Sequence, residues 1–315
     1  MPKLIAQRLF FGALTLLAVS VLIFAATELL PGDTASAILG RQATPEAAAA
    51  IRAELGLDRP APVRYAEWLA GFARGDLGRS LANAEPIGPR LGERLGNTLF
   101  LAAVATLLAV PLAVGLGVAA AVWRDGLFDR AATSLTLAAI SVPEFFVGYL
   151  LIVLLAVYLP VLPSLATVSP GMGLPERLQA VALPALTLTL VVVAHMMRMT
   201  RAAVVDQLSA PYAEMARLKG LSAARVVVRH ALPNALGPIA AVVALNLAYL
   251  VAGVVVVEVV FVYPGAGQYM VDAVAKRDVP VVQACALAFA AAYVALNLLA
   301  DILALLGNPR LRHPR

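Results

Sequence analysis

The chain has 315 residues, of which 61% are hydrophobic and only 14% are charged. An average soluble domain has about 45–50% apolar and about 25% charged residues, so this chain has too little polar surface for a water-exposed globule of its size. The same composition excludes a disordered, collagen-like or coiled-coil chain. The net charge of +5 indicates orientation in a membrane rather than a nucleic-acid partner.

Six long runs are almost free of charged residues. A bilayer core of about 30 Å is crossed by about 20 apolar residues in a helix. The runs therefore predict an all-α membrane protein with a single transmembrane domain over residues 1–315. The predicted spans cover residues 9–30, 97–123, 131–158, 178–199, 237–261 and 280–306.

The distribution of Lys and Arg predicts the orientation of these spans. Basic residues concentrate in the segments that lie inside if the N-terminus is inside, whereas the short outside loops hold only Arg177, Lys276 and Arg277. We therefore expect both termini in the cytoplasm and a large outside loop over residues 31–94. Within that loop, N-cap, proline and C′-glycine signals predict short helices over residues 46–55 and 62–74.

Two predicted spans carry a small residue at every fourth position, a pattern that allows helices in lipid to approach closely. The stripes are Ala105, Ala109, Ala113, Gly117 and Ala121 in the second span, and Ala240, Ala244, Ala248 and Ala252 in the fifth.

The inside segment over residues 201–236 is too polar to span and is expected to form two short helices around a turn. Ser209 is expected to cap the first helix, Gly220 to end it and Ser222 to cap the second, with Pro233 stopping the pattern before the fifth span. Its apolar and charged faces suit either a docking element for a partner or a hairpin on lipid headgroups. The residues alone leave both interpretations open.

This segment resembles the EAA loop of ABC importer permeases. Glu214-Met215-Ala216, three residues, Gly220, nine residues and then His230-Ala231-Leu232-Pro233 keep the family spacing. Two positions depart, because Met215 replaces an Ala and His230 replaces an Ile. The stretch over residues 229–234 is similar to the first permease subunit of the dipeptide, oligopeptide and nickel importers.

Further motifs extend this resemblance, in order, over nearly the whole chain. They are Leu55-Gly56-Leu57-Asp58-x-Pro60, Tyr65-x-x-Trp68, Arg74-Gly75-Asp76-Leu77-Gly78-x-Ser80, Glu258 with Phe261-x-x-Pro264-Gly265-x-Gly267-Gln268, and Arg277-Asp278-x-Pro280-Val281-Val282-Gln283.

The resemblance implies a type I ABC importer permease (MetI-like) fold in the bacterial inner membrane, in contact with the lipid bilayer. It also implies three kinds of protein partner: a homologous second permease, two ATP-binding subunits and an extracytoplasmic solute-binding protein. The coupling residues it implies are Glu214, Met215, Ala216, Arg217, Lys219, Gly220, His230, Leu232 and Pro233. Among them, Gly220 would permit the tight bend, and the charged residues would dock the ATPase.

No catalytic residue, metal site or cofactor is expected on this chain. Cys285 is the only cysteine, and the three histidines lack metal-ligand spacing. None of the three lysines stands in the Gly-Lys-Ser/Thr sequence of a P-loop, so ATP and Mg²⁺ must bind on partner subunits.

Two acidic residues, Glu144 and Glu258, fall within or near predicted spans, where charges are costly and are functional candidates. Glu144 either faces the transport pathway, where it would meet a peptide ammonium or another cation, or bonds to a neighbouring helix. For Glu258 we expect a structural role near the end of its span.

Small peptides are the leading substrate prediction, and nickel or another small solute is the alternative. A stand-alone secondary transporter or channel is a remote alternative, because it would make the EAA spacing a coincidence. An intramembrane enzyme would need a nucleophile–base pair or a metal cluster, and the sequence has neither an HExxH nor a GxSxG motif.

Overall fold

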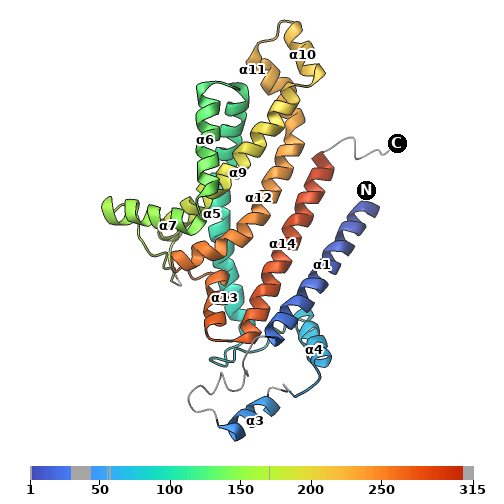
Figure 1. Ribbon diagram of the computed structural model, residues 1–315, viewed down its shortest axis with the longest axis vertical. Helices are drawn as coiled ribbons and strands as arrows, with labels where there is room; N and C mark the ends of the chain where they lie inside the picture. Colours follow the sequence, from blue (N-terminus) through green and yellow to red (C-terminus); the bar gives the residue numbers. More distant parts are fainter. Residues whose placement is uncertain (1, 30–43, 55, 57, 170, 308–315) are drawn as a thin grey trace. The chain divides into compact units, whose positions relative to one another are not determined.

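A computed structural model describes residues 2–29, 44–54, 56, 58–169 and 171–307, and within these ranges the chain is helical without a β-strand (Figure 1). The chain forms two compact units. Unit 1 comprises Met1–Leu9, Leu99–Tyr263 and Ala295–Arg315, and unit 2 comprises Phe10–Thr98 and Pro264–Val294. Residues 30–43, in the predicted outside loop, and the residues after Gly307 lie outside the described residues.

Five of the described helices are long and apolar enough to cross a membrane. They are α1 (Pro2–Glu28), α5 (Ile87–Val122), α9 (Ala182–Leu208), α12 (Leu232–Val260) and α14 (Val279–Gly307). Each overlaps one of the predicted spans. The sixth prediction, residues 131–158, corresponds to a bent pair of helices, so the number of spans is five, or up to six if that pair counts as one.

The third predicted span is a bent pair of helices rather than one continuous helix. Helix α6 (Leu127–Ser141) ends before Pro143, and α7 (Glu144–Ile152) continues as the π-helix η2 (Val153–Tyr158) at an angle of 101° to α6. The ring of a proline disfavours helical backbone at the preceding residue, and Val142 is accordingly extended, with ψ of 128°. In Figure 1, α7 turns away from the direction of α6.

Several predicted boundaries are corrected by the structure. Helix α5 begins at Ile87, so the end of the expected outside loop, residues 31–94, is helical. Helix α9 continues to Leu208 and α12 starts at Leu232, which shortens the loop expected over residues 201–236. Charge-free runs mark the residues that suit lipid, but they do not mark where a helix ends. A helix can continue through a charged residue, such as Arg201, whose side chain has a partner.

Helix α9 forms the centre of unit 1, where it packs against α12, α6 and α7. The small-residue stripe of α5 also packs on it. Gly117 is buried, and a Cβ there would lie 2.7 Å from the Met197 carbonyl oxygen and from Thr200 Cβ. In α12, Ala244 and Ala248 are buried as well. The predicted close packing of the second span is therefore confirmed.

The core of unit 2 joins the first turns of α5 to α13 (Ala266–Ala275) and α14. Ile87 and Leu91 pack with Ala266, Val281 and Cys285, which is a buried free thiol in this core.

A carboxylate holds the loop before α5 onto the same unit. Asp278 is buried and accepts hydrogen bonds from Ser80 Oγ at 2.5 Å and from the Leu81 amide at 3.0 Å. This contact gives a physical reason for the paired motifs at residues 74–80 and 277–283.

The two short helices predicted in the outside loop are confirmed as α3 (Pro45–Glu54) and α4 (Ala61–Ala73). Gly56 follows α3 with φ of +63°, as expected for a C′ glycine. Helix α4 rests on α1 through Tyr65, whose hydroxyl lies 2.8 Å from Ser20 Oγ and whose ring stacks edge-on against Phe24. Leu55 and Leu57 of the resemblance motif lie outside the described residues.

The α5–α9 contact predicts opposite effects for two neighbouring glycines. Gly117→Ala places a methyl group against backbone and should lower the free energy of unfolding by about 1–3 kcal/mol. Gly115 has open space around its Cβ position, so Gly115→Ala should be neutral or stabilise the helix by up to about 1 kcal/mol. Thermal unfolding of the purified variants in detergent measures the difference, and equal shifts in both variants would contradict the close contact.

Candidate functional site

The segment after α9 forms a compact hairpin of two short helices. Helix α10 (Pro211–Leu218) is followed by Gly220 and then by α11 (Ala223–Val226). Figure 1 shows both at the end of α9 and α12 within unit 1. Gly220 has φ of +81°, and the Leu221 amide donates to the Ala216 carbonyl oxygen at 3.2 Å. This is the glycine-dependent C-terminal motif that reverses a chain tightly, as the sequence predicted for Gly220.

Two details of the predicted hairpin are wrong. Ala210 rather than Ser209 precedes α10 as its N-cap, because α9 extends to Leu208 and Ser209 completes the end of that helix. Pro233 does not stop the second helix either. The backbone passes from α11 through the π-helix η3 (Val227–Ala231) into α12, with Pro233 in the first turn of α12. The wider π-helical turn accommodates the proline, which has no amide hydrogen to donate.

Helix α10 buries small residues and exposes large ones. Ala213 and Ala216 are buried against Val204, Leu208 and Val226. On the opposite side, the exposed fractions of Met215 and Leu218 are 54% and 76%. We call the exposed residues Glu214, Met215, Arg217, Leu218 and Lys219 the α10 outer face. Apolar side chains among charges of both signs are suited to a protein partner that buries the former and pairs the latter.

The remaining predicted coupling residues divide between the surface and the core. Gly220 and Pro233 are exposed, whereas His230 and Leu232 are half-buried. Ala216 lies in the core, so its side chain fixes α10 to the helices behind it. The His230 carbonyl oxygen accepts a hydrogen bond from Asn234 Nδ2 at 2.7 Å.

Tyr212 anchors the start of α10 through its hydroxyl, which donates to Gln207 Oε1 at 2.8 Å. Burial raises the pKa of Tyr212 above its usual value, and the nearby Asn234 side chain opposes that shift. The phenol therefore stays neutral at physiological pH and contributes a hydrogen bond without a charge.

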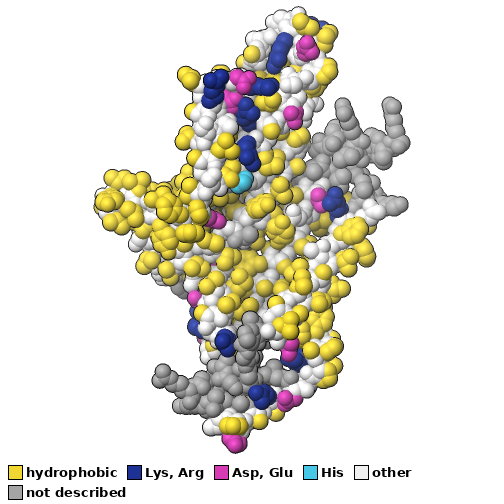
Figure 2. Space-filling model, in the orientation of Figure 1, with side chains coloured by type: hydrophobic (Ala, Val, Ile, Leu, Met, Phe, Trp, Pro, Cys, Tyr) yellow, Lys and Arg dark blue, Asp and Glu magenta, His cyan; other side chains and the backbone are white. Residues whose placement is uncertain are grey.

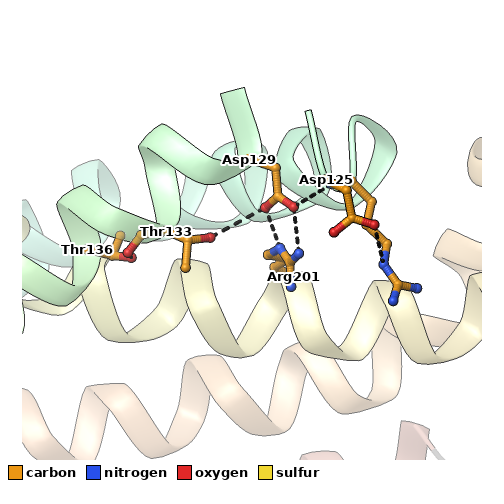
Figure 3. Close-up of polar contacts among 6 residues, drawn as sticks. Asp125, Asp129, Thr133, Thr136 and Arg201 are labelled. Atoms are coloured by element: carbon orange, nitrogen blue, oxygen red, sulfur yellow. Dashed lines mark hydrogen bonds and ion pairs between the residues drawn. The ribbon is translucent and has the colours of Figure 1, made fainter. Parts of the chain in front are cut away.

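An ion pair that the sequence analysis missed links α6 to α9 (Figure 3). Arg201 donates from Nε and Nη2 to the two carboxylate oxygens of Asp129, at 2.5 and 2.6 Å. The Asp125 amide and the Thr133 hydroxyl also donate to Asp129, which is buried. Bidentate pairs of this kind fix geometry as well as energy. Arg201 lies seven residues before the end of α9, and α10 packs on that end of the helix. The ion pair therefore links α6 to the part of α9 that supports α10.

Sequence reasoning had only a weak signal for this pair. Asp129 and Arg201 are 72 residues apart, and each looks like an ordinary charge at the end of a predicted span. The single available clue was that both lie next to apolar runs, where an unpaired charge is costly.

The two intramembrane candidates lie in different surroundings. Glu258 is fully buried in the last turn of α12. Glu144 is the first residue of α7, directly after the bend, and its side chain is half-buried. Its carboxylate oxygens lie 2.9 and 3.0 Å from the position that a Cβ on Gly253 would occupy. Within the described ranges, His, Cys, Asp and Glu form no group of three or more that could hold a metal ion.

Comparison with known proteins assigns almost the whole chain to one kind of protein. Residues 113–313 match the family described as binding-protein-dependent transport system inner membrane component, and residues 1–102 match the N-terminal region of such membrane components. The glutathione transport system permease protein GsiC of Salmonella typhi is 37% identical over 99% of this chain and 100% of its own length. A predicted peptide transport system permease protein of Brucella abortus (strain 2308) is 38% identical over the same shares.

The Asp129–Arg201 pair predicts a stability cost that a surface pair does not share. Arg201→Gln leaves a buried carboxylate without its two strongest donors, and we expect a loss of about 2–3 kcal/mol because Arg201 is itself partly exposed. Arg124→Gln breaks only the exposed pair with Asp125 and should cost less than about 1 kcal/mol.

Unfolding of the detergent-solubilised variants measures both changes. The double variant Asp129→Asn with Arg201→Gln should recover part of the loss, since no charge is then left unpaired. Equal stability of Arg201→Gln and Arg124→Gln would show that the pair contributes little.

Proposed function

This chain belongs to the family of binding-protein-dependent transport system inner membrane components, and we propose that it is the permease subunit of an ATP-driven importer of small peptides. The proposal is supported by relatives of the same length named for glutathione and peptide transport. Glutathione is itself a tripeptide, so both names describe peptides.

The α10 outer face is the observation that carries the ATP-driven part of this proposal. Met215 and Leu218 are exposed at the end of a helix bundle, among Glu214, Arg217 and Lys219. The chain itself has no P-loop, so ATP and Mg²⁺ bind on partner subunits. We place α10 in a surface cleft of one ATP-binding subunit, with Met215 and Leu218 as the apolar anchors.

Movement of α10 passes to unit 1 through contacts that the structure describes. Ala213 and Ala216 pack on Val204 and Leu208 of α9, and Arg201 of the same helix is bonded to Asp129 of α6. An ATP-driven closure of the partner pair would therefore displace α6 and α9 with α10. This is a two-state membrane element biased by a nucleotide-dependent partner.

The orientation follows from the location of ATP. We place α10 and both termini in the cytoplasm and residues 31–94 outside, where a solute-binding protein delivers the peptide. A homologous second permease completes the pathway. The excess of Lys and Arg in the segments assigned to the inside supports this arrangement.

Replacement of one apolar anchor tests the docking role. Leu218→Asp should reduce the ATP-binding subunit recovered with the tagged chain by about tenfold or more, because a charge replaces a buried contact at the centre of the interface. Leu174→Asp is the matched control, because Leu174 is 61% exposed in α8 (Leu174–Ala180), outside the hairpin. Normal recovery with Leu218→Asp, at normal chain stability, would refute docking through α10.

A further inference from the structure

Glu144 occupies a position created by the bend between α6 and α7. Because Val142 is extended before Pro143, the helix restarts at Glu144, and its carboxylate lies at the junction rather than on the side of a continuous helix. Helix α7 packs against α9 and α12 in unit 1. Glu144 therefore lies at the start of a helix that packs against two candidate membrane spans, α9 and α12.

The Glu144 carboxylate has no counter-charge in the described part of the chain. No hydrogen bond or ion pair of its side chain is found among the described residues, whereas the Asp129 carboxylate has Arg201, the Asp125 amide and Thr133. Instead, the Glu144 oxygens lie against the α12 backbone at Gly253, within 3.0 Å of where a Cβ would stand. Gly253 thus leaves the room that this carboxylate fills.

Glu144 lies beside Gly253, well within the length of α12. Gly253 is seven residues from the end of α12 and 21 from its start, which corresponds to about 10 and 30 Å along the helix. An unpaired charge facing hydrocarbon at such a depth costs several kcal/mol. A half-buried carboxylate without a counter-charge among the described residues is suited to water or to a cationic group supplied from outside the chain.

A second polar surface in unit 1 lies on α9. His195 and Arg198 are exposed at i,i+3 spacing, while the neighbouring Met196 and Met197 are buried. His195 is the middle residue of α9, about 20 Å from either end, so this polar face also continues far into the helix. Figure 2 shows basic, histidine and acidic side chains gathered over α6 and α9 on one face.

We propose that Glu144 is a specificity-determining residue that binds a cationic group of the transported peptide, namely its amino-terminal ammonium or a Lys or Arg side chain. This inference rests on the proposed function. A carboxylate that holds no donor of its own offers several acceptor positions to an ammonium group, and such charge-assisted bonds are the stronger ones. Gly253 has no Cβ, which leaves the carboxylate its room beside α12.

The test uses the complete importer in proteoliposomes, with both permeases, the ATP-binding subunits and the binding protein. Competing uptake of Lys-Ala-Lys and Asp-Ala-Asp gives a charge preference for each variant. The same binding protein serves all variants, so its own preference cancels when the variants are compared. Uptake is expressed per assembled complex, which separates transport from assembly.

Glu144→Gln should reduce the preference for Lys-Ala-Lys over Asp-Ala-Asp by about tenfold, as expected from the loss of one charged hydrogen bond. Gly253→Ala should change the preference in the same direction, because the added methyl group displaces the carboxylate without removing it. Glu93→Gln is the matched control, since Glu93 belongs to an exposed surface pair, and it should leave the preference unchanged.

An unchanged preference in Glu144→Gln would overturn the inference, whether uptake of both peptides stays normal or falls equally. An unchanged preference together with a loss of assembled complex would also overturn it and would indicate a pair with the second permease. Failure of the unmodified importer to take up either peptide would instead refute the peptide assignment, and the inference with it.

Discussion

In lipid, apolar helices gain little from burying apolar surface against each other, so close packing and polar pairs must hold them together. The contact of Gly117 on α5 with the backbone of α9 is the clearest case in unit 1. It lets α9 occupy the centre of the unit, with α12, α6 and α7 around it. Helix α9 then sets the position of the hairpin that contains α10, because only Ser209 and Ala210 separate the two helices.

The same constraint explains why two acidic residues in unit 1 differ. Asp129 is buried and fully engaged, so it acts as a fixed joint between α6 and α9. Glu144 lies on a helix break and finds no counter-charge among the described residues. A structural carboxylate is satisfied by its own chain, whereas one that acts on a passing solute must keep its acceptors free. The presence of a counter-charge therefore distinguishes the structural role of Asp129 from the role in specificity that we propose for Glu144.

The sequence alone locates the apolar helices and the tight turn at Gly220. Runs without charge depend only on local composition. A glycine between two helical patterns indicates a tight turn, because glycine readily adopts a positive φ. The bend at Pro143 could not be predicted in this way. Pro111 and Pro238 lie inside α5 and α12, which continue through them, so a proline alone does not decide whether a helix breaks.

The long-range polar contacts were also beyond the sequence. Asp129 and Arg201 meet only because α6 folds back along α9, and the burial of Asp278 under Ser80 requires the packing of unit 2. The predicted coupling residues were found through their spacing. However, the spacing could not show that Ala216 faces the core while Met215 and Leu218 face outward, which depends on how α10 rests on α9.

The central claim is that the α10 outer face contacts a nucleotide-binding partner. A photo-crosslinking amino acid at residue 218, activated in intact membranes and followed by mass spectrometry of the adduct, tests this contact directly. We expect an adduct with a protein that contains a P-loop, and none with that protein when the same group is placed at residue 174. Adducts at residue 218 only with lipid, or only with proteins lacking a nucleotide site, would contradict the account.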